Sequence, residues 1–365
     1  MKISAQNEVK IWEKQILRDV VDPTFYKSFM QDLEQLLVTK EWNVYKWLHQ
    51  PYPTPEGPSG YDLWANVVEF GHIHQYLLPS LERDLIQNYL PFLNRAFSSM
   101  KPFGIMAGAG TRWAVLNKEI PTLKAINACG AADWDLSSQM AYDATDLIRE
   151  KLRIKSVPLV KDFSEPLIQL LELAGSSPVF VTMFGCTLGN DINLEHVPQN
   201  FAKVLNRKGF FWLTIDSSSH EAAVAGYQSS PYTSFQNNYW TFAKHMTEDE
   251  NFDETAIRYH PYYTEAINDD SSRNHYKAVI HRHVVVRDTV IRIGNKSYTL
   301  EKDMEFKIGQ SQKWKPEDIR KPFADAGWDQ LAVMQQGNVA AVLYAGQDTP
   351  KDWLLPVVKA LESKA

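Results

Sequence analysis

The stretch MFGCTLGN, residues 183–190, combines residue types that suit a ligand cradle. It follows an apolar run, and its glycines and small side chains let a ligand approach the backbone closely. Asn190 closes the stretch with a side chain that both donates and accepts hydrogen bonds. At the end of a predicted strand, this pattern indicates a small-molecule site.

Two earlier apolar runs end in residues of related kinds. FGIMAGAG ends in Gly108, Ala109 and Gly110, which permit a tight turn and bring backbone N–H groups close to a ligand. The next run ends at Asp135, whose carboxylate suits the two hydroxyls of a ribose. Asp133 competes for that role, and Asp135 also fits a plain helix N-terminal charge.

A third run ends in Asp162 and Phe163. The acid suits the exocyclic amine of an adenine, and the ring suits its face. Each strand-end motif is a weak signal alone. Their order along the chain is glycines, then an acid, then an acid with an aromatic residue, then the glycine-rich end of the fourth strand, and this order fits an adenosyl ligand. A nicotinamide dinucleotide would need a third glycine for its pyrophosphate. Arg112 and Trp113 stand there instead, which favours S-adenosylmethionine.

The elements that must position these residues follow from the hydrophobic pattern. From about residue 100, short apolar runs alternate with helical segments, which predicts a doubly wound parallel α/β sheet. Residues 1–50 have helical spacing and precede a proline-rich break. From about residue 220 the pattern changes to a helix and then alternating β-branched runs with an IGNK turn. The sheet domain is therefore expected to carry a separate α+β lobe.

Composition excludes several classes of function. The net charge is −6, and Lys and Arg are dispersed, so nothing favours nucleic acid. Two cysteines are too few for a disulfide framework and are consistent with a reducing cytoplasm. No stretch approaches the ~20 apolar residues of a membrane span, and the N-terminus lacks the apolar core of a signal peptide. We expect a cytoplasmic protein, monomeric or homodimeric, with a small-molecule substrate.

With these motifs, the chain resembles the histidine-specific S-adenosylmethionine methyltransferases of ergothioneine biosynthesis, a group that includes fungal N-methyltransferases of prenylated tryptophan. The resemblance covers roughly residues 60–345. FGCTLGND is similar to the family's G-S-T-[IL]-G-N, DLSS to its D-I-S, and KDF to its G-D-F. EAAVAGYQ and SQKWKPEDIRKPFADAGW resemble a substrate-contacting segment and the last helix.

The resemblance implies a class I, Rossmann-like methyltransferase fold. It places the cofactor domain at residues 75–217 plus 313–365 and the substrate lobe at 1–74 plus 218–312. S-adenosylmethionine is the implied cofactor and S-adenosylhomocysteine its product. The expected cofactor-binding residues are Gly108, Ala109, Gly110, Asp135, Leu136, Asp162, Phe163, Gly185 and Thr187. Asn190, Tyr227 and Tyr76 would orient the substrate for catalysis, and these three together with Ser311 would bind it.

Three residues depart from the family pattern: Met106 implies that the methionine end of the cofactor is held differently or more weakly, while Leu77 and Gly309 point away from histidine as the substrate. Met106 replaces an acid two residues before the first glycine, and Leu77 replaces the second tyrosine of a pair. Gly309 replaces a glutamate that faces the imidazole. We expect an N-methyltransferase of another amino acid or related amine. The departures also leave open a rival, an inactive protein that binds the cofactor or a partner.

Methyl transfer to an amine is an in-line displacement, so positioning and desolvation should dominate over covalent work by the protein. His72 or His74 could accept the proton, but the sequence favours plain surface histidines at both positions. His281 and His283 share one strand face and could chelate a metal, but no third ligand is evident, so no metal is expected. Cys186 is interpreted as a small packing residue.

Overall fold

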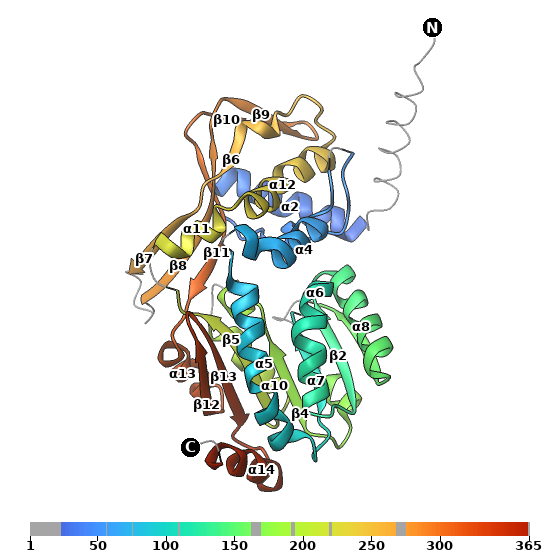
Figure 1. Cartoon of the computed structure of the whole chain (residues 1–365). Helices are drawn as coiled ribbons and strands as arrows, with labels where there is room; N and C mark the ends of the chain where they lie inside the picture. Colours follow the sequence, from blue (N-terminus) through green and yellow to red (C-terminus); the bar gives the residue numbers. More distant parts are fainter. Residues whose placement is uncertain are drawn as a thin grey trace. The chain divides into compact units, whose positions relative to one another are not determined.

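The computed structural model describes residues 23–55, 57–74, 76–108, 110–161, 169–190, 194–218, 221–267 and 275–363. Ala109, Asp162 and Phe163 lie outside the described residues. The chain forms two compact units (Figure 1). Unit 1 comprises Met1–Val67, Tyr227–Tyr262 and Ile280–Gly309, and unit 2 comprises Val68–Gly226, Tyr263–Val279 and Gln310–Ala365.

Unit 2 is built on a seven-stranded sheet with the order β12-β13-β5-β4-β1-β2-β3. Its strands are β1 Phe103–Ala107, β2 Gly130–Asp135, β3 Lys155–Val160, β4 Val179–Met183, β5 Phe210–Asp216, β12 Trp328–Gln336 and β13 Val339–Gly346. Strands β1 to β5 pair in parallel, while β13 runs antiparallel to both β5 and β12. The predicted doubly wound α/β sheet is confirmed, with one reversed strand near its edge.

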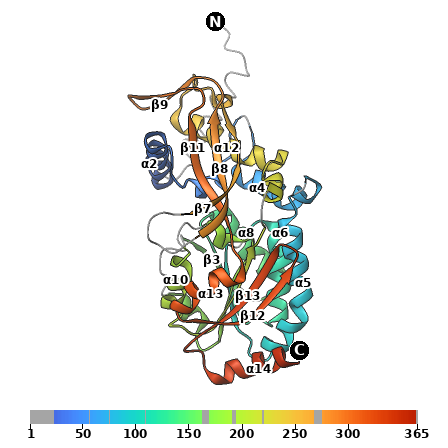
Figure 2. The ribbon, with the colours of Figure 1, turned by 90° about the vertical axis from the view of Figure 1, so that its left-hand side faces the viewer.

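Helices cover both faces of this sheet. The described helical elements that lie wholly or mostly in unit 2 are η1 Gly71–His74, α5 Leu78–Phe97, α6 Arg112–Ala114, η2 Val115–Glu119, α7 Ile120–Ala125, α8 Ser138–Leu152, α9 Gln169–Ala174, η3 Thr187–Asn190, α10 His196–Val204, α11 Glu221–Tyr227, α13 Pro316–Asp325 and α14 Lys351–Glu362. One core cluster joins α9, α10 and α13 to the sheet, and the other joins α5, α7, α8 and α14. Figure 2 shows α10 and α13 on one face and α5 on the other.

The strand alternation explains this layering. Ile105 belongs to the first cluster and its neighbour Met106 to the second, because successive side chains of a strand point to opposite faces. Both are fully buried. Apolar runs of this kind, without polar alternation, are typical of parallel sheets covered on both sides.

Two helices begin where the sequence provides caps. The Ser137 hydroxyl accepts from the Met140 N–H at 3.4 Å and so caps the start of α8. The Thr111 hydroxyl accepts from the Ala114 N–H, also at 3.4 Å, and so begins the helical run after the first glycine turn. That run contains one π-helical turn, η2, a form that often occurs at functional sites.

The other elements lie wholly or partly in unit 1. They are α2 Pro23–Thr39, α3 Tyr45–Leu48, α4 Gly60–Phe70, α12 Ser230–Thr247, η4 Glu254–Ala256, β6 Ile257–Tyr259, β7 Tyr262–Ile267, β8 His275–Val285, β9 Thr289–Ile293, β10 Lys296–Leu300 and β11 Glu305–Lys313. One sheet has the order β11-β8-β6, with β7 also pairing with β8. The predicted IGNK turn joins β9 to β10, with Gly294 at φ +56°. No helix in the described part of the chain has the length and apolar character to cross a bilayer.

Candidate active site

The ends of β1 and β4 meet at Gly108 and Thr187. Gly108 follows β1 with φ +78°, in the left-handed region that glycine adopts without strain. A Cβ atom at Gly108 would lie 3.0 Å from Thr187 Oγ1, so the Thr187 side chain packs directly against the glycine. The Thr187 hydroxyl donates to the Phe184 carbonyl at 2.7 Å, which holds it in this position. Two predicted cofactor residues are therefore neighbours.

Asp135 ends β2 beside the same turn. Its Oδ1 accepts from the Ser137 N–H at 2.8 Å, and its Oδ2 accepts a long bond from the Gly110 N–H at 3.5 Å. Burial raises the pKa of this carboxyl from 3.8 to about 6, although the backbone N–H groups around it act in the opposite direction. Its side chain is only half-buried, and the following Leu136 is exposed. The Asp135 carboxylate thus lies at the carboxyl end of β2, and it is mostly ionised at neutral pH.

Asp133, the competitor in the sequence, has a different environment. It is fully buried, and its Oδ2 accepts from the Ser156 hydroxyl at 2.6 Å and the Thr145 hydroxyl at 2.7 Å. Those bonds link β2 to β3 and α8. Asp133 therefore has a packing role inside the sheet, which leaves Asp135 as the candidate for ligand contact.

The stretch after β4 has an unusual backbone. Gly185 has φ +71° and Cys186 has φ +54°, and the Cys186 side chain is buried. Gly189 lies against another segment of the chain, because a Cβ atom there would be 2.7 Å from the Gln312 carbonyl oxygen. The backbone of strand β11 therefore lies directly against Gly189. Asn190, half-buried, ends the η3 turn that follows.

A buried ion pair joins the end of β5 to β11. The Lys313 ammonium lies 2.6 Å from Asp216 Oδ2, and their side chains are 1% and 5% exposed. The same ammonium donates to Ser311 Oγ at 3.0 Å, so this predicted substrate residue belongs to the pair's hydrogen-bond network. The Trp314 N–H donates to the Asp216 carbonyl at 3.0 Å. Ser311 and Gln312 are thus fixed beside the ends of β4 and β5.

Tyr227 lies in unit 1, within a group of rings. Its ring centroid is 4.8 Å from that of Tyr232 and 5.6 Å from that of His281. Gly309, also in unit 1, has Tyr45 against its Cα, because a Cβ atom there would be 3.4 Å from the Tyr45 side chain. The Tyr45 ring in turn stacks on His281 at 5.6 Å. The position of the family's glutamate therefore lies against the Tyr45 side chain, with the Asn43 amide oxygen 3.7 Å from where a Cβ atom would be.

Both histidines of the HRH run on β8 make hydrogen bonds in the core. Tyr259 Oη and His281 Nδ1 are 2.8 Å apart, and the Trp240 indole donates to His283 Nδ1 at 2.8 Å. Burial lowers the pKa of His283 to about 3, so its ring stays neutral. No cluster of three or more potential metal ligands occurs among the described residues.

Tyr76 lies in unit 2 and is 6% exposed. Its N–H donates to the Gly71 carbonyl at 2.8 Å, and its side chain covers the Gly71 Cα. Leu77, in contrast, is half-exposed at 51%, and so is His72 in the preceding turn. The side chain of His74 lies outside the described residues.

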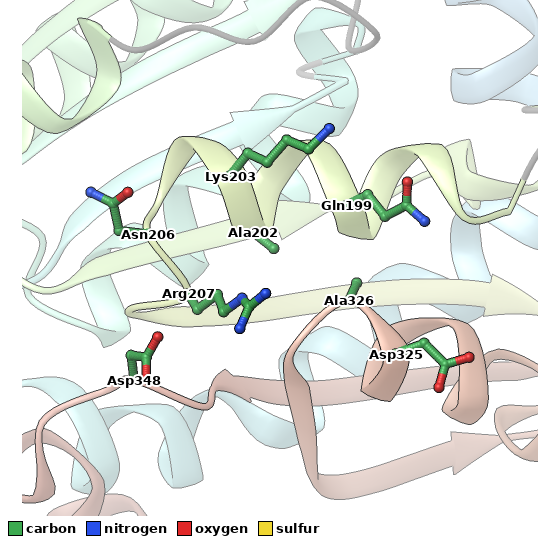
Figure 3. Close-up of a pocket in the computed structure, with 8 residues that line it drawn as sticks. All are labelled: Gln199, Ala202, Lys203, Asn206, Arg207, Asp325, Ala326 and Asp348. Carbon is green, nitrogen blue, oxygen red and sulfur yellow. The ribbon is translucent and has the colours of Figure 1, made fainter.

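A polar groove lies at the opposite edge of the main sheet. Its lining residues are Gln199, Ala202, Lys203, Asn206, Arg207, Asp325, Ala326 and Asp348 (Figure 3). They come from the end of α10, the loop before β5, the end of α13 and the segment after β13. Ligands of open α/β sheets bind at the carboxyl ends of the strands, so this groove is set apart from the predicted site.

Sequence reasoning missed two buried carboxylates, Glu82 and Asp216, and the lysines paired with them. Glu82 is fully buried on α5, and its Oε2 lies 2.6 Å from the Lys118 ammonium. Asp216 holds Lys313, as described above. Glu82 has a local signal, since it stands on the apolar face of α5 with Leu85 and Ile86. Asp216 has none, because its partner lies far along the chain.

The sheet order, its one reversed strand, and the glycine turn and acid at the ends of β1 and β2 define a class I methyltransferase dependent on S-adenosylmethionine. The family model described as "histidine-specific methyltransferase, SAM-dependent" matches residues 57–345. The chain belongs to this family, as the sequence motifs predicted. No curated protein sequence matches it.

Solved structures similar to this chain include three methyltransferases. One is an S-adenosylmethionine-dependent methyltransferase from Clostridium acetobutylicum ATCC 824, with 14% identity, a TM-score of 0.37, and coverage of 76% of this chain and 97% of that one. The glycopeptide N-methyltransferase MtfA with S-adenosyl-L-homocysteine has 11% identity, a TM-score of 0.33, and coverage of 67% and 81%. The 1,6-didemethyltoxoflavin-N1-methyltransferase of Burkholderia thailandensis has 9% identity, a TM-score of 0.36, and coverage of 82% and 92%.

Proposed function

We propose that this methyltransferase transfers the methyl group to the nitrogen of an amino acid or an amino-acid-derived small amine other than histidine. The supporting observation is the contact between Gly108 and Thr187 at the ends of β1 and β4, beside the half-buried Asp135. Backbone N–H groups and one carboxylate meet there without any basic side chain among the named residues. That donor set fits an adenosyl group, which carries no phosphate, better than a dinucleotide.

Each predicted cofactor residue then has a role. Asp135 accepts hydrogen bonds from the ribose, and Leu136 packs against the nucleoside. Gly108 and Gly110, both with positive φ, leave room for the amino-acid part of the cofactor. Gly185 and Thr187 border the same space, and Ala109, Asp162 and Phe163 complete the proposed set. When bound, S-adenosylmethionine supplies an electrophilic methyl group on a sulfonium.

The substrate residues orient the acceptor. A neutral amine must lie about 3 Å from the methyl carbon and in line with the sulfur, which then leaves with the bonding electron pair. Asn190 would bind the amino-acid end of the substrate, together with Tyr227. Tyr76 and Ser311 would complete the orientation. Their work is to position and desolvate the amine, which favours its neutral form.

The departures from the family motif support a substrate other than histidine. At Gly309 no carboxylate is available for an imidazole N–H, and Tyr45 lies against the glycine instead. Leu77 offers an apolar, half-exposed side chain in place of a tyrosine hydroxyl. Neither position carries the side chain that the family has there. The proposal also includes a cytoplasmic location and a monomeric or homodimeric state.

A methyl-transfer assay tests this function. The protein would be incubated with methyl-labelled S-adenosylmethionine and a panel of amino acids and small amines, with histidine included. We expect label on the nitrogen of at least one amine, and a rate for histidine below that of the best substrate. Transfer only to oxygen or carbon acceptors, or to histidine in preference to all others, would overturn the proposed substrate class. Cofactor binding without transfer to any amine would favour the inactive rival.

A further inference from the structure

A carboxylate on α5 holds the loop that follows β4. Glu82 is fully buried, and its Oε1 accepts from the Gly185 N–H at 2.5 Å and from the Thr214 hydroxyl. Its Oε2 accepts from the Lys118 ammonium at 2.6 Å. One side chain thus joins α5 to the loop after β4, to β5 and to the π-helical turn η2. Hydrogen bonds to an ionised acceptor in such surroundings are about twice as strong as neutral ones.

Gly185 lies near the start of the loop that follows β4, two residues after the last strand residue, Met183. Two residues later, Thr187 forms the contact with Gly108, and the same turn ends at Asn190. Gly185 has a positive φ and no side chain to fix its conformation. Its hydrogen bond to Glu82 therefore adds a constraint from α5 to the hydrogen bonds within the loop, such as that of the Thr187 hydroxyl to the Phe184 carbonyl.

A second carboxylate lies next to Lys118. Glu119 Oε2 accepts from the Thr182 hydroxyl at 2.9 Å, and Thr182 is the β4 partner of Met106 in the sheet register. Met106 stands where related methyltransferases have an acid, and its own side chain belongs to the apolar cluster. Burial raises the pKa of Glu119 to about 8, so it is uncharged near neutral pH and leaves Lys118 to balance Glu82.

We propose that Glu82 is the positioning residue that holds the loop of residues 184–190 in its ligand-binding form, with Lys118 as its counter-ion. The inference rests on the proposed role of this loop in binding the cofactor and the amine. Glu82 itself acts through the Gly185 N–H and is not expected to contact either ligand.

Two double variants separate positioning from simple packing. Glu82→Gln with Lys118→Met removes both buried charges but keeps an oxygen acceptor for the Gly185 N–H. Glu82→Leu with Lys118→Leu removes the charges and the acceptor together. Neither leaves an unpaired buried ion, which would be strongly destabilising. The measurements are S-adenosylhomocysteine affinity by calorimetry, KM and kcat, and hydrogen exchange at Gly185 in the ligand-free protein.

We expect the leucine pair to bind S-adenosylhomocysteine at least 10-fold more weakly than the Gln/Met pair, with faster Gly185 exchange. KM for S-adenosylmethionine should rise more than kcat falls. Equal affinity and equal Gly185 exchange in the two variants would overturn the proposal, because both lose the same buried charges. If the leucine pair does not fold, the Gln/Met pair is compared with wild type instead. Its neutral acceptor forms a weaker hydrogen bond, so exchange at the Gly185 N–H should be about 5-fold faster than in wild type. An unchanged rate contradicts the proposal.

Failure of the proposed function gives a different result. If the wild-type protein binds no S-adenosylhomocysteine, the role of the loop is wrong. Exchange at Gly185 in the ligand-free variants then still reports whether Glu82 holds the loop. Amides of β2, which pairs with β1 and β3, serve as the internal reference for global opening.

Discussion

The Lys313 ammonium lies 2.6 Å from the Asp216 carboxylate, and both side chains are almost completely buried. The Ser218 N–H also donates to Asp216, at 2.9 Å. Lys321 and Asp325 form a pair of the same residue types at the same 2.6 Å, but their side chains are 71% and 59% exposed. The chain therefore contains a buried Lys–Asp pair and a matched exposed control.

We predict that Lys313→Met lowers the free energy of unfolding by about 3–5 kcal/mol, because it leaves the Asp216 charge buried without its partner. Lys321→Met should change it by no more than about 0.5 kcal/mol, because exposed pairs contribute little. Denaturant unfolding of both variants checks this. A cost for Lys313→Met as small as that for Lys321→Met would show that water reaches Asp216.

A second prediction concerns the glycine turn after β1. Gly108→Ala and Gly337→Ala both place a side chain at positive φ, which costs about 1–2 kcal/mol. A Cβ atom at Gly108 would also press on Thr187, whereas at Gly337 nothing lies within 4 Å. Both variants should lose stability, but only Gly108→Ala should weaken S-adenosylhomocysteine binding, by about 10-fold or more. Calorimetry that finds the same affinity for both would remove this turn from the cofactor site.

Asp135 makes cofactor affinity depend on pH. Burial raises its pKa to about 6, so the carboxylate is ionised above that pH and accepts hydrogen bonds from the ribose. Below pH 6 it gains a proton and loses an acceptor, so affinity should fall by about 10-fold between pH 7 and pH 5. Asp135→Asn should bind weakly at both values. The pKa of Asp133 is also raised to about 6, and this residue remains in the variant, so a fall that persists in Asp135→Asn would be assigned to Asp133 instead.

Asn190→Ala should separate substrate from cofactor binding. We expect KM for the amine to rise by about 10-fold, the loss of one or two hydrogen bonds, while S-adenosylhomocysteine affinity stays within about 2-fold of wild type. Asn94→Ala, an exposed change on α5, is the matched control and should leave both unchanged. Steady-state kinetics and calorimetry give the two numbers. A collapse of cofactor binding in Asn190→Ala would reassign the residue to the cofactor.

Local sequence signals predicted much of unit 2. Strands β1, β4, β5 and β13 are mostly apolar runs, and their alternation with helical segments was sufficient to predict the doubly wound sheet. Strand β12, Trp328–Gln336, was not predicted from the sequence. It is an edge strand with a register shift, and its mixed burial gives no clean alternation.

The site was only partly predictable for a similar reason. Glycines and acids at strand ends are visible in the sequence, because the turn chemistry is local. The bonds of Glu82 to Gly185 and of Lys313 to Asp216 join residues about a hundred positions apart. Such partners come together only through the order of the strands. The close approach of β11 to Gly189 is likewise a tertiary contact that no local pattern announces.

Hydrogen exchange with and without S-adenosylhomocysteine is the sharpest test of a cofactor site at the ends of β1, β2 and β4. It compares this side of the sheet with the opposite side in one experiment. We expect new protection at the segments around Gly108, Asp135 and Gly185, and no change in the groove around Lys203 and Arg207. Protection confined to that groove, with the three strand ends unchanged, would contradict this expectation.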